Sequence, residues 1–456
     1  MTTATFWCEH AWLGGDRVAD SVTVEVTDGR VTELQAGTEA ATGATVLGGL
    51  ILPGFANAHS HAFHRALRSR TQRDRGTFWT WRTLMYRAAG RLTPQSYYEL
   101  ARAVYAEMVL AGITCVGEFH YLHHGPAGQR YDDPNAMGHA LIAAARDAGL
   151  RITLLDTCYL SSGVDGAPLA QGPQQRFGDG SGLGWAQRAE SLHEYYRRAD
   201  DVVIGAALHS VRGVPADQMG AVVDWAQAHQ SPLHVHSSEQ TAEVDQCLAV
   251  HGCTPTALLG EHGALGPLTT AVHATHLTDA DIDDLDRTAT GVCFCPTTER
   301  DLGDGIGPAA ALLRSAGLFS LGSDSHAVID LFEEARGVEL DERLARRERG
   351  LFDAADLLRA ATANGHAALG FTDAGVLEVG MRADLVAVDL GSVRTAGGPA
   401  SPETMVFAAT AADVTDVIID GRVRVAQRRH VGIETPAGEL ARTITALFDD
   451  EPARIR

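Results

Sequence analysis

The stretch that decides the fold of this chain is residues 53–67, which read Pro-Gly-Phe-Ala-Asn-Ala-His-Ser-His-Ala-Phe-His-Arg-Ala-Leu. It follows a short apolar run, so we expect a β-strand that ends near His59. Because side chains alternate along an extended segment, His59 and His61 lie on the same side, as two imidazoles that chelate one cation must. Taken alone, the pair could equally be ordinary core or surface histidines, so the rest of the chain has to decide.

Outward from this stretch, short apolar strands alternate with longer Ala-, Leu- and Arg-rich helical stretches, from about residue 51 to 371. Further strands are expected at 113–119, 151–156, 202–208, 232–236, 270–273, 291–295 and 318–324. With the strand that ends near His59 they make eight, which predicts an α/β fold, a (β/α)8 TIM-like barrel of about 320 residues. The alternative, an open doubly wound sheet, would require a Gly-rich phosphate turn after an early strand, and the sequence has none there.

The two ends of the chain share a different texture. Short alternating strands with Asp-Gly turns occur at 21–34 and again at 383–390 and 414–425. We therefore expect both ends to pair into one small β-sandwich domain. The predicted division is 1–51 for its N-terminal part, 52–375 for the barrel, and 376–456 for its C-terminal part plus a terminal helix.

Composition narrows the class of partner. The 456 residues carry 37 basic and 58 acidic side chains, a formal net charge of −21, without a Lys/Arg block. Nucleic acid and membrane surfaces need a basic face, so a small-molecule substrate is expected instead. The N-terminus lacks the pattern of a signal peptide and the seven scattered cysteines form no disulfide framework, which predicts a cytoplasmic protein with reduced thiols.

Polar residues stand where the predicted strands end, which is where a barrel places its chemistry. The fifth strand carries His234 and His236 and leads to Glu239; the sixth ends at His273; the eighth leads to Asp324. Nitrogen and oxygen ligands from strands one, five and eight suit a mononuclear Zn²⁺ or Fe²⁺ site with an open water position. His234 and His236 face the same way, so one of the two is expected either behind a ligand or packed inside the barrel.

Five motifs with this spacing are PGFANAHSHAFHRAL, HVHSSE, VHATHL, GSDSH and GMRADLVAVDL. Together they resemble the amidohydrolase superfamily, in its deaminase branch, over essentially the whole chain. The segments 78–86, 118–124 and 208–212 are similar, more narrowly, to the deiminases of bacterial histidine degradation, which convert N-formimidoyl-L-glutamate to N-formyl-L-glutamate and ammonia.

The resemblance implies a role for each matching residue. His59, His61, His236 and Asp324 would hold one divalent metal ion per subunit, with Zn²⁺ preferred and Fe²⁺ open. Glu239, His273 and Asp324 would be catalytic, with hydroxide formed on the metal attacking the formimidoyl carbon. His64, Arg82, Tyr121, His209 and Arg212 would bind substrate. Planar guanidinium groups grip carboxylates, which gives Arg82 and Arg212 a purpose in a substrate with two carboxylates, although which arginine takes which stays open.

One position departs from the family pattern, because His64 stands where glutamine is usual. A histidine offers one donor or acceptor at each ring nitrogen, so its substrate contact is expected to change and to become sensitive to pH. Trp79 and Trp81 are expected to pack and to position a loop that carries Arg82. His120, His123, His124 and His139 are expected on loops or at the surface.

Two other functions remain open from the sequence. A deaminase of a ring substrate, such as guanine or a triazine, would use the same metal ligands but has no need of two arginines. A catalytically inactive barrel that serves as a scaffold would have little reason to keep buried charges at the strand ends. A homodimer is expected from the family and from the frequency of two-fold assemblies.

Overall fold

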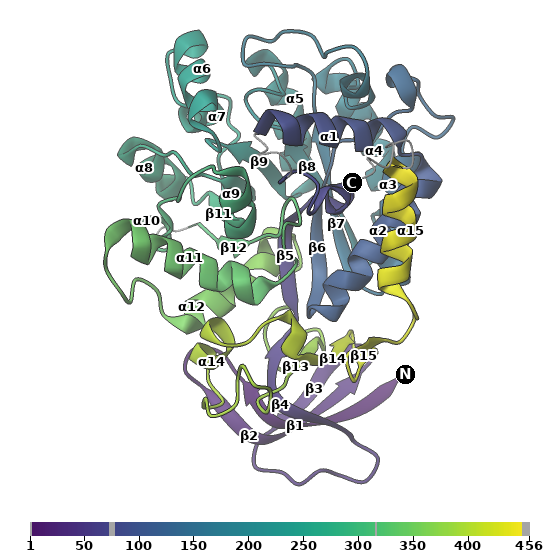
Figure 1. The fold of residues 1–456 in the computed structure, drawn as a ribbon, viewed down its shortest axis with the longest axis vertical. Helices are drawn as coiled ribbons and strands as arrows, with labels where there is room; N and C mark the ends of the chain where they lie inside the picture. The colour runs from purple at the N-terminus through teal and green to yellow at the C-terminus, as the bar shows by residue number, and fades with distance from the viewer. Residues whose placement is uncertain (1, 73–77, 315–316, 449–456) are drawn as a thin grey trace, which may run out of the picture.

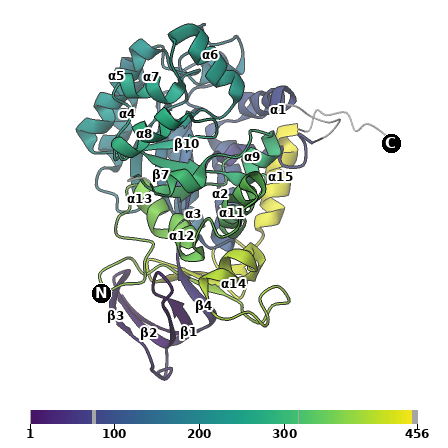
Figure 2. The same ribbon diagram turned by 90° about the vertical axis from the view of Figure 1, so that its left-hand side faces the viewer.

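The chain forms two sheets that lie one above the other in Figure 1. A computed structural model describes residues 2–72, 78–314 and 317–448. In both views the barrel occupies the upper part of the molecule and the smaller sheet lies below it (Figures 1 and 2).

The upper sheet is the predicted barrel. Its strands pair in parallel and in chain order, β5 (Phe55–Ser60), β6 (Ile113–His120), β7 (Arg151–Cys158), β8 (Val202–Leu208), β9 (Leu233–Ser237), β10 (Thr269–His273), β11 (Gly291–Phe294) and β12 (Phe319–Leu321). A parallel bridge between Ser60 and Asp324 joins the last strand to the first. The eight-stranded barrel expected from the apolar runs is confirmed.

Helices cover the outside of the barrel (Figure 1). Thr93 caps the second of them, since its side chain accepts a hydrogen bond from the Ser96 amide and a proline follows. The third ends where Gly149 adopts a φ of +85°, a conformation that favours glycine. The helices are α1 (Phe78–Arg91), α2 (Pro94–Leu110), α3 (Ala136–Ala148), α4 (Gly182–Tyr196), α5 (Ala216–His229), α6 (Thr241–His251), α7 (Pro255–Glu261), α8 (Asp279–Arg287), α9 (Pro296–Leu302), α10 (Ala309–Leu312), α11 (Leu331–Arg346), α12 (Ala354–Arg359), α13 (Gly365–Ala368), α14 (Pro402–Phe407) and α15 (Pro436–Phe448).

The lower sheet is mixed and comes from both ends of the chain, as expected. Its order is β16-β15-β14-β13-β4-β1-β2-β3, and β13 joins the C-terminal strands to β4. The strands are β1 (Thr3–Trp12), β2 (Val18–Thr27), β3 (Arg30–Gln35), β4 (Thr45–Pro53), β13 (Leu385–Val388), β14 (Val414–Ile419), β15 (Arg422–Ala426) and β16 (Arg429–His430).

Two links fix the barrel to the lower sheet. Only Gly54 separates β4 from β5, so the lower sheet leads directly into the strand that carries His59. A buried ion pair joins Arg151 at the start of β7 to Asp384. After β16 the chain returns to the barrel, where α15 packs beside α2 (Figure 1).

The cysteines and the helices can each be considered across the described residues. All seven cysteines are free thiols. Within residues 2–72, 78–314 and 317–448, no helix combines the length and the apolar character that a membrane span needs.

Candidate active site

The predicted site residues meet at the carboxyl ends of the barrel strands. His59 is the fifth residue of β5, His236 lies on β9, and His273 is the last residue of β10. Asp324 follows β12, and its backbone amide donates to the carbonyl oxygen of His59 at 2.9 Å. The bridge that completes the barrel therefore also brings Asp324 beside the first pair of histidines.

Four of these side chains surround one point. Nε2 of His59 lies 3.1 Å from Nε2 of His236 and 3.4 Å from Oδ1 of Asp324. Nε2 of His61 lies 3.3 Å from the same Oδ1 atom. One ligand atom from each of the four residues falls within 4.8 Å of all the others, and all four residues are buried. The separations suit a small cation at the centre.

Backbone carbonyls orient two of the imidazole rings. Nδ1 of His61 donates to the carbonyl oxygen of Phe119 at 2.9 Å, and Nδ1 of His236 donates to that of His209 at 2.8 Å. Each bond fixes the tautomer that leaves Nε2 free to coordinate, which is the usual outer arrangement around a metal-binding histidine. The donor set thus fits a divalent metal ion.

The charge state of the rings agrees with this. Burial, followed by the neighbouring imidazoles, holds the pKa of His59 and of His236 well below the usual value. Burial also lowers the pKa of His61 to about 3. The rings are therefore neutral at physiological pH, and neutral imidazole is the form that binds metals.

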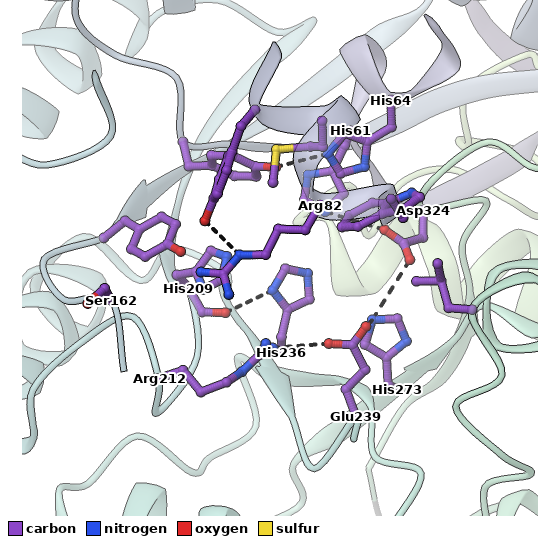
Figure 3. A pocket seen from close by; sticks show the side chains of 16 residues that line it. His61, His64, Arg82, Ser162, His209, Arg212, His236, Glu239, His273 and Asp324 are labelled. Carbon is purple, nitrogen blue, oxygen red and sulfur yellow. Dashed lines mark hydrogen bonds and ion pairs between the residues drawn. The ribbon is translucent and has the colours of Figure 1, made fainter. Parts of the chain in front are cut away.

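Glu239 and His273 lie at one side of this set (Figure 3). Nε2 of His273 is 3.8 Å from Oε1 of Glu239 and 3.8 Å from Oδ2 of Asp324. Its other nitrogen, Nδ1, faces Oε1 of Glu299 at 3.4 Å, and Glu299 accepts a further bond from the Cys295 amide at 2.9 Å. Burial alone would lower the pKa of His273, but the surrounding carboxylates raise it well above the usual value. His273 is thus placed to exchange a proton with Glu239 or Asp324.

Two arginines face the same pocket from different elements. Arg82 projects from α1, and its Nε donates to the Tyr86 hydroxyl at 2.7 Å. Nη2 of Arg212 donates to Oε2 of Glu239 at 3.1 Å, and its Nε lies 3.4 Å from Oε2 of Glu243. Burial keeps the pKa of His209 well below its usual value, and the positive charges of Arg212 and, to a smaller extent, Arg82 add to this effect. Both guanidinium groups therefore lie near His209 (Figure 3).

The remaining predicted contacts also line the pocket. His64 and Tyr121 are linked by a 2.9 Å hydrogen bond between Nε2 and the hydroxyl. The ring of His209 stacks on Tyr159 with 3.9 Å between centroids. Every predicted substrate-binding residue lines this pocket, together with His61, His236, Glu239, His273 and Asp324; those predicted for substrate are His64, Arg82, Tyr121, His209 and Arg212.

Two expectations about neighbouring residues were wrong, those for Arg82 and His120, whereas Trp81 packs against the core as expected. Arg82 belongs to a helix and not to a loop, and Trp81 lines the pocket, where its ring meets that of His64 edge-on at 5.2 Å. The side chain of Trp79 lies outside the described part of the structure. His120 is the last residue of β6 and is buried, whereas His123 and His124 lie on the loop after β6, as expected, with buried side chains. His124 bonds there to Asp179 at 3.0 Å.

His234 packs inside the barrel. Its Nε2 donates to the carbonyl oxygen of Ala368 at 3.1 Å. The ring is therefore bonded elsewhere and is not part of the ligand set.

Sequence reasoning missed several groups beside the site. Glu243 on α6 and Glu299 on α9 are buried, as is Asp304 just beyond α9. Tyr86 and Tyr159 line the pocket. A signal existed for Glu299, because it lies one helical turn after the strand that ends beside Cys295, where a first-turn side chain can reach the mouth of a barrel.

A parallel barrel with one histidine on its first strand and another just after it, one on the fifth and an aspartate after the eighth defines a class of hydrolases. The family model for the amidohydrolase family matches residues 50–424, so the chain belongs to that family. It is 37% identical over 447 residues to formimidoylglutamate deiminase from Pseudomonas aeruginosa, covering 94% of this chain and 97% of the relative.

Solved structures agree with the fold. An amidohydrolase from Brucella melitensis superposes with a TM-score of 0.90 at 30% identity, over 97% of this chain and 99% of that one. An adenosine deaminase from Xanthomonas campestris with bound zinc superposes with a TM-score of 0.84 at 25% identity, over 98% of both chains. The protein is a hydrolase that acts on a C–N bond.

Proposed function

We propose that this protein hydrolyses the formimidoyl group of N-formimidoyl-L-glutamate, giving N-formyl-L-glutamate and ammonia. The observation that carries the proposal is the presence of Arg82 and Arg212 in the same pocket as Glu239, His273 and Asp324. A substrate with two carboxylates and a cationic amidine needs both kinds of group. The similarity to the deiminase of Pseudomonas aeruginosa supports the same reaction.

The arginines would hold the two carboxylates of the substrate. A guanidinium group presents parallel N–H donors that match a carboxylate, and such charged bonds are about twice as strong as neutral ones. Arg212 already donates to a carboxylate, that of Glu239, at 3.1 Å. A substrate carboxylate would bind the same guanidinium group in a similar geometry. The amidine would then lie towards Glu239.

His59, His61, His236 and Asp324 would hold one divalent ion, for which we propose Zn²⁺. Such an ion, when bound, lowers the pKa of a coordinated water from 15.7 towards ~7 and so supplies a nucleophile at neutral pH. His61, His236 and Asp324 also line the pocket, so an ion held by this set would be within reach of the substrate.

The chain's own groups would move the protons. Oδ2 of Asp324 would accept a proton from the attacking water, while Oε1 of Glu239 would accept a hydrogen bond from the amidinium group of the substrate. Nε2 of His273 lies 3.8 Å from each of these carboxylates, so it can orient the water and steady both. The proton held by Asp324 would pass to the former imino nitrogen, and the hydroxyl proton of the addition product would pass to Glu239. The C–N bond then breaks and ammonia leaves, with the formyl oxygen coming from water.

The test is ammonia release by the zinc-loaded protein. N-formimidoyl-L-glutamate should turn over, whereas N-formimidoyl-L-glutamine, which lacks the side-chain charge, and guanine should not. Arg82→Met and Arg212→Met should each raise KM by about 10- to 100-fold, in line with the loss of a charged hydrogen-bond pair of about 1.5–3 kcal/mol. Turnover of guanine in place of the amidine would instead support a ring deaminase and end the assignment of both arginines.

We also propose the pathway, the compartment and the oligomeric state of the enzyme. In histidine degradation the enzyme would act in the cytoplasm as a homodimer, and light scattering of the purified chain measures that assembly directly.

A further inference from the structure

The two oxygens of Asp324 face different groups. Oδ1 lies 3.4 Å from Nε2 of His59 and 3.3 Å from Nε2 of His61, within the ligand set described above. Oδ2 points the other way, towards Nε2 of His273 at 3.8 Å. A carboxylate in this position can bind one cation through each oxygen.

A thiol completes a second set of donors. Cys295 follows β11 and is fully buried, and the proposed reaction gives its Sγ atom no task. One ligand atom from each of His273, Cys295 and Asp324 falls within 4.8 Å of the other two. Imidazole nitrogen, thiolate sulfur and carboxylate oxygen are the three ligand types that zinc and similar ions take in proteins.

The surroundings favour a cation there. Three carboxylates face the His273 ring: Oε1 of Glu239 at 3.8 Å, Oε1 of Glu299 at 3.4 Å, and Asp324 itself. Proton transfer in the proposed reaction accounts for the carboxylates beside His273 but not for a buried thiol at the same point. His273 and Asp324 also line the pocket, so an ion can enter by the route that the substrate takes.

We propose that His273, Cys295 and Asp324 form a second site for a thiophilic divalent cation such as Zn²⁺, Co²⁺ or Cd²⁺, and that its occupation inhibits the hydrolase. On binding, the S–H bond breaks and sulfur bonds to the metal, while the thiol proton and the Nε2 proton of His273 both leave to solvent, so that Nε2 can bind the ion. The inhibition rests on the proposed function, because the ion would take Nε2 of His273 and Oδ2 of Asp324. The site itself does not.

The test begins with protein that holds one equivalent of Zn²⁺, to which Co²⁺ is added. A thiolate bound to Co²⁺ gives a charge-transfer absorption in the near ultraviolet, and equilibrium dialysis counts the ions. Cys295→Ala and Cys295→Ser remove the sulfur ligand. Cys158→Ala is the matched control, because Cys158 is also fully buried and is the last residue of a barrel strand, β7.

We expect the wild type and Cys158→Ala to take a second equivalent that brings the thiolate band, and both Cys295 variants to keep the first ion without the band. Excess Zn²⁺ should inhibit the wild type. The inhibitory concentration should rise at least about tenfold in the Cys295 variants, since even residues that merely support a ligand contribute ~10- to 100-fold to metal affinity.

Two results would overturn the inference. One is saturation of the wild type at a single ion while it turns over N-formimidoyl-L-glutamate, which leaves the proposed function standing. The other is a second ion with the same band in the Cys295 variants. A wild type that binds no ion at all would end the metal assignment of the proposed function as well.

Discussion

Two groups of buried carboxylates in this barrel differ in how completely their oxygens are bonded. The first, which we call the paired cluster, consists of Asp156, Asp179 and Arg188 between β7 and α4. Arg188 bonds to both oxygens of Asp156 at 2.7 Å and to Oδ2 of Asp179 at 2.9 Å. His124 bonds to the other oxygen of Asp179 at 3.0 Å. Burial would raise the pKa of Asp156, yet the Arg188 charge lowers it below the usual value.

The second group, which we call the open cluster, consists of Glu239, Glu243, Glu299 and Asp304 beside the pocket. Within the described residues, both oxygens of Glu243 and Oδ2 of Asp304 lack a hydrogen-bond partner. Burial raises the pKa of Glu243 to about 7 and that of Asp304 to about 9, the nearby Glu239 charge adding to the rise of Asp304.

This difference in hydrogen bonding indicates that the paired cluster serves stability and the open cluster serves function. A buried charge whose bonds are all made inside the protein stabilises one arrangement of the chain, and removing its partner is costly. A buried carboxylate with unused oxygens is held at a cost in stability, and such groups concentrate where a ligand or a proton will arrive.

Asp324→Asn should abolish the chemistry and leave the fold intact. The variant loses a ligand of the proposed ion and the acceptor for the water proton, and a proton acceptor alone contributes about 10²- to 10⁴-fold to rate. We expect at least about 10⁴-fold lower kcat and a chain that no longer keeps its metal after dialysis. Metal content and circular dichroism measure the two effects separately. Retained metal with unchanged activity would remove Asp324 from the site.

Glu239→Gln should reduce kcat by about 10²- to 10⁴-fold, the usual contribution of a positioned proton donor or acceptor. At pH 8 it should not lower the melting temperature, because Glu243, 3.4 Å from Arg212, is ionised there and remains as a counter-ion. Steady-state kinetics and thermal unfolding on the same sample test both halves. A variant that is active but much less stable would place Glu239 with the paired cluster.

Arg188→Gln should do the opposite. It leaves Asp156 and Asp179 buried without their counter-ion, which costs about 3–5 kcal/mol of unfolding free energy. Turnover per folded molecule should stay within a few-fold of wild type. Arg197→Ala, at the C-terminal cap of the same helix, is the matched control: its ion pair with Glu194 is exposed, so about 0–1 kcal/mol should be lost. Equal losses for the two variants would contradict the contrast between the clusters.

The same contrast shows what sequence could reveal. His59, His61, His236, His273 and Asp324 were found because strand ends converge in a barrel and alternation fixes which side chains face inward. Glu243 and Glu299 lie on helices that follow those strands, and their approach to the site depends on how each helix packs across the barrel mouth. Periodicity along a helix reports the apolar face and carries no information about such a contact.

Glu243→Gln should change the pH dependence of stability. The folded protein holds the Glu243 proton up to about pH 7, whereas the ordinary pKa of the group is 4.5. Between these values the folded state binds more protons than the unfolded state, so this carboxyl makes stability fall as the pH rises. The slope is at most about 1.4 kcal/mol per pH unit.

Glutamine removes that fall, and urea unfolding from pH 4.5 to 7 measures it. Glu261→Gln, at an exposed position, should leave the slope as it is. An unchanged slope in Glu243→Gln would show that this carboxylate is ionised throughout the range and belongs with the paired groups.

His64→Gln should have the smallest effect. Nδ1 of His64 has no hydrogen-bond partner within the described residues, while Nε2 meets the Tyr121 hydroxyl at 2.9 Å. Burial, then the charges of nearby histidines, keeps the pKa of His64 well below its usual value, so the ring stays neutral at physiological pH. The sequence-based expectation of a pH-sensitive contact is therefore replaced by a neutral hydrogen bond.

A glutamine amide can donate to or accept from Tyr121 equally well. We expect KM within about fivefold of wild type, since one neutral hydrogen bond contributes about 0.5–1.5 kcal/mol, and a superimposable pH profile of kcat/KM. A profile that loses an ionisation near neutral pH in His64→Gln would show that His64 titrates during substrate binding after all.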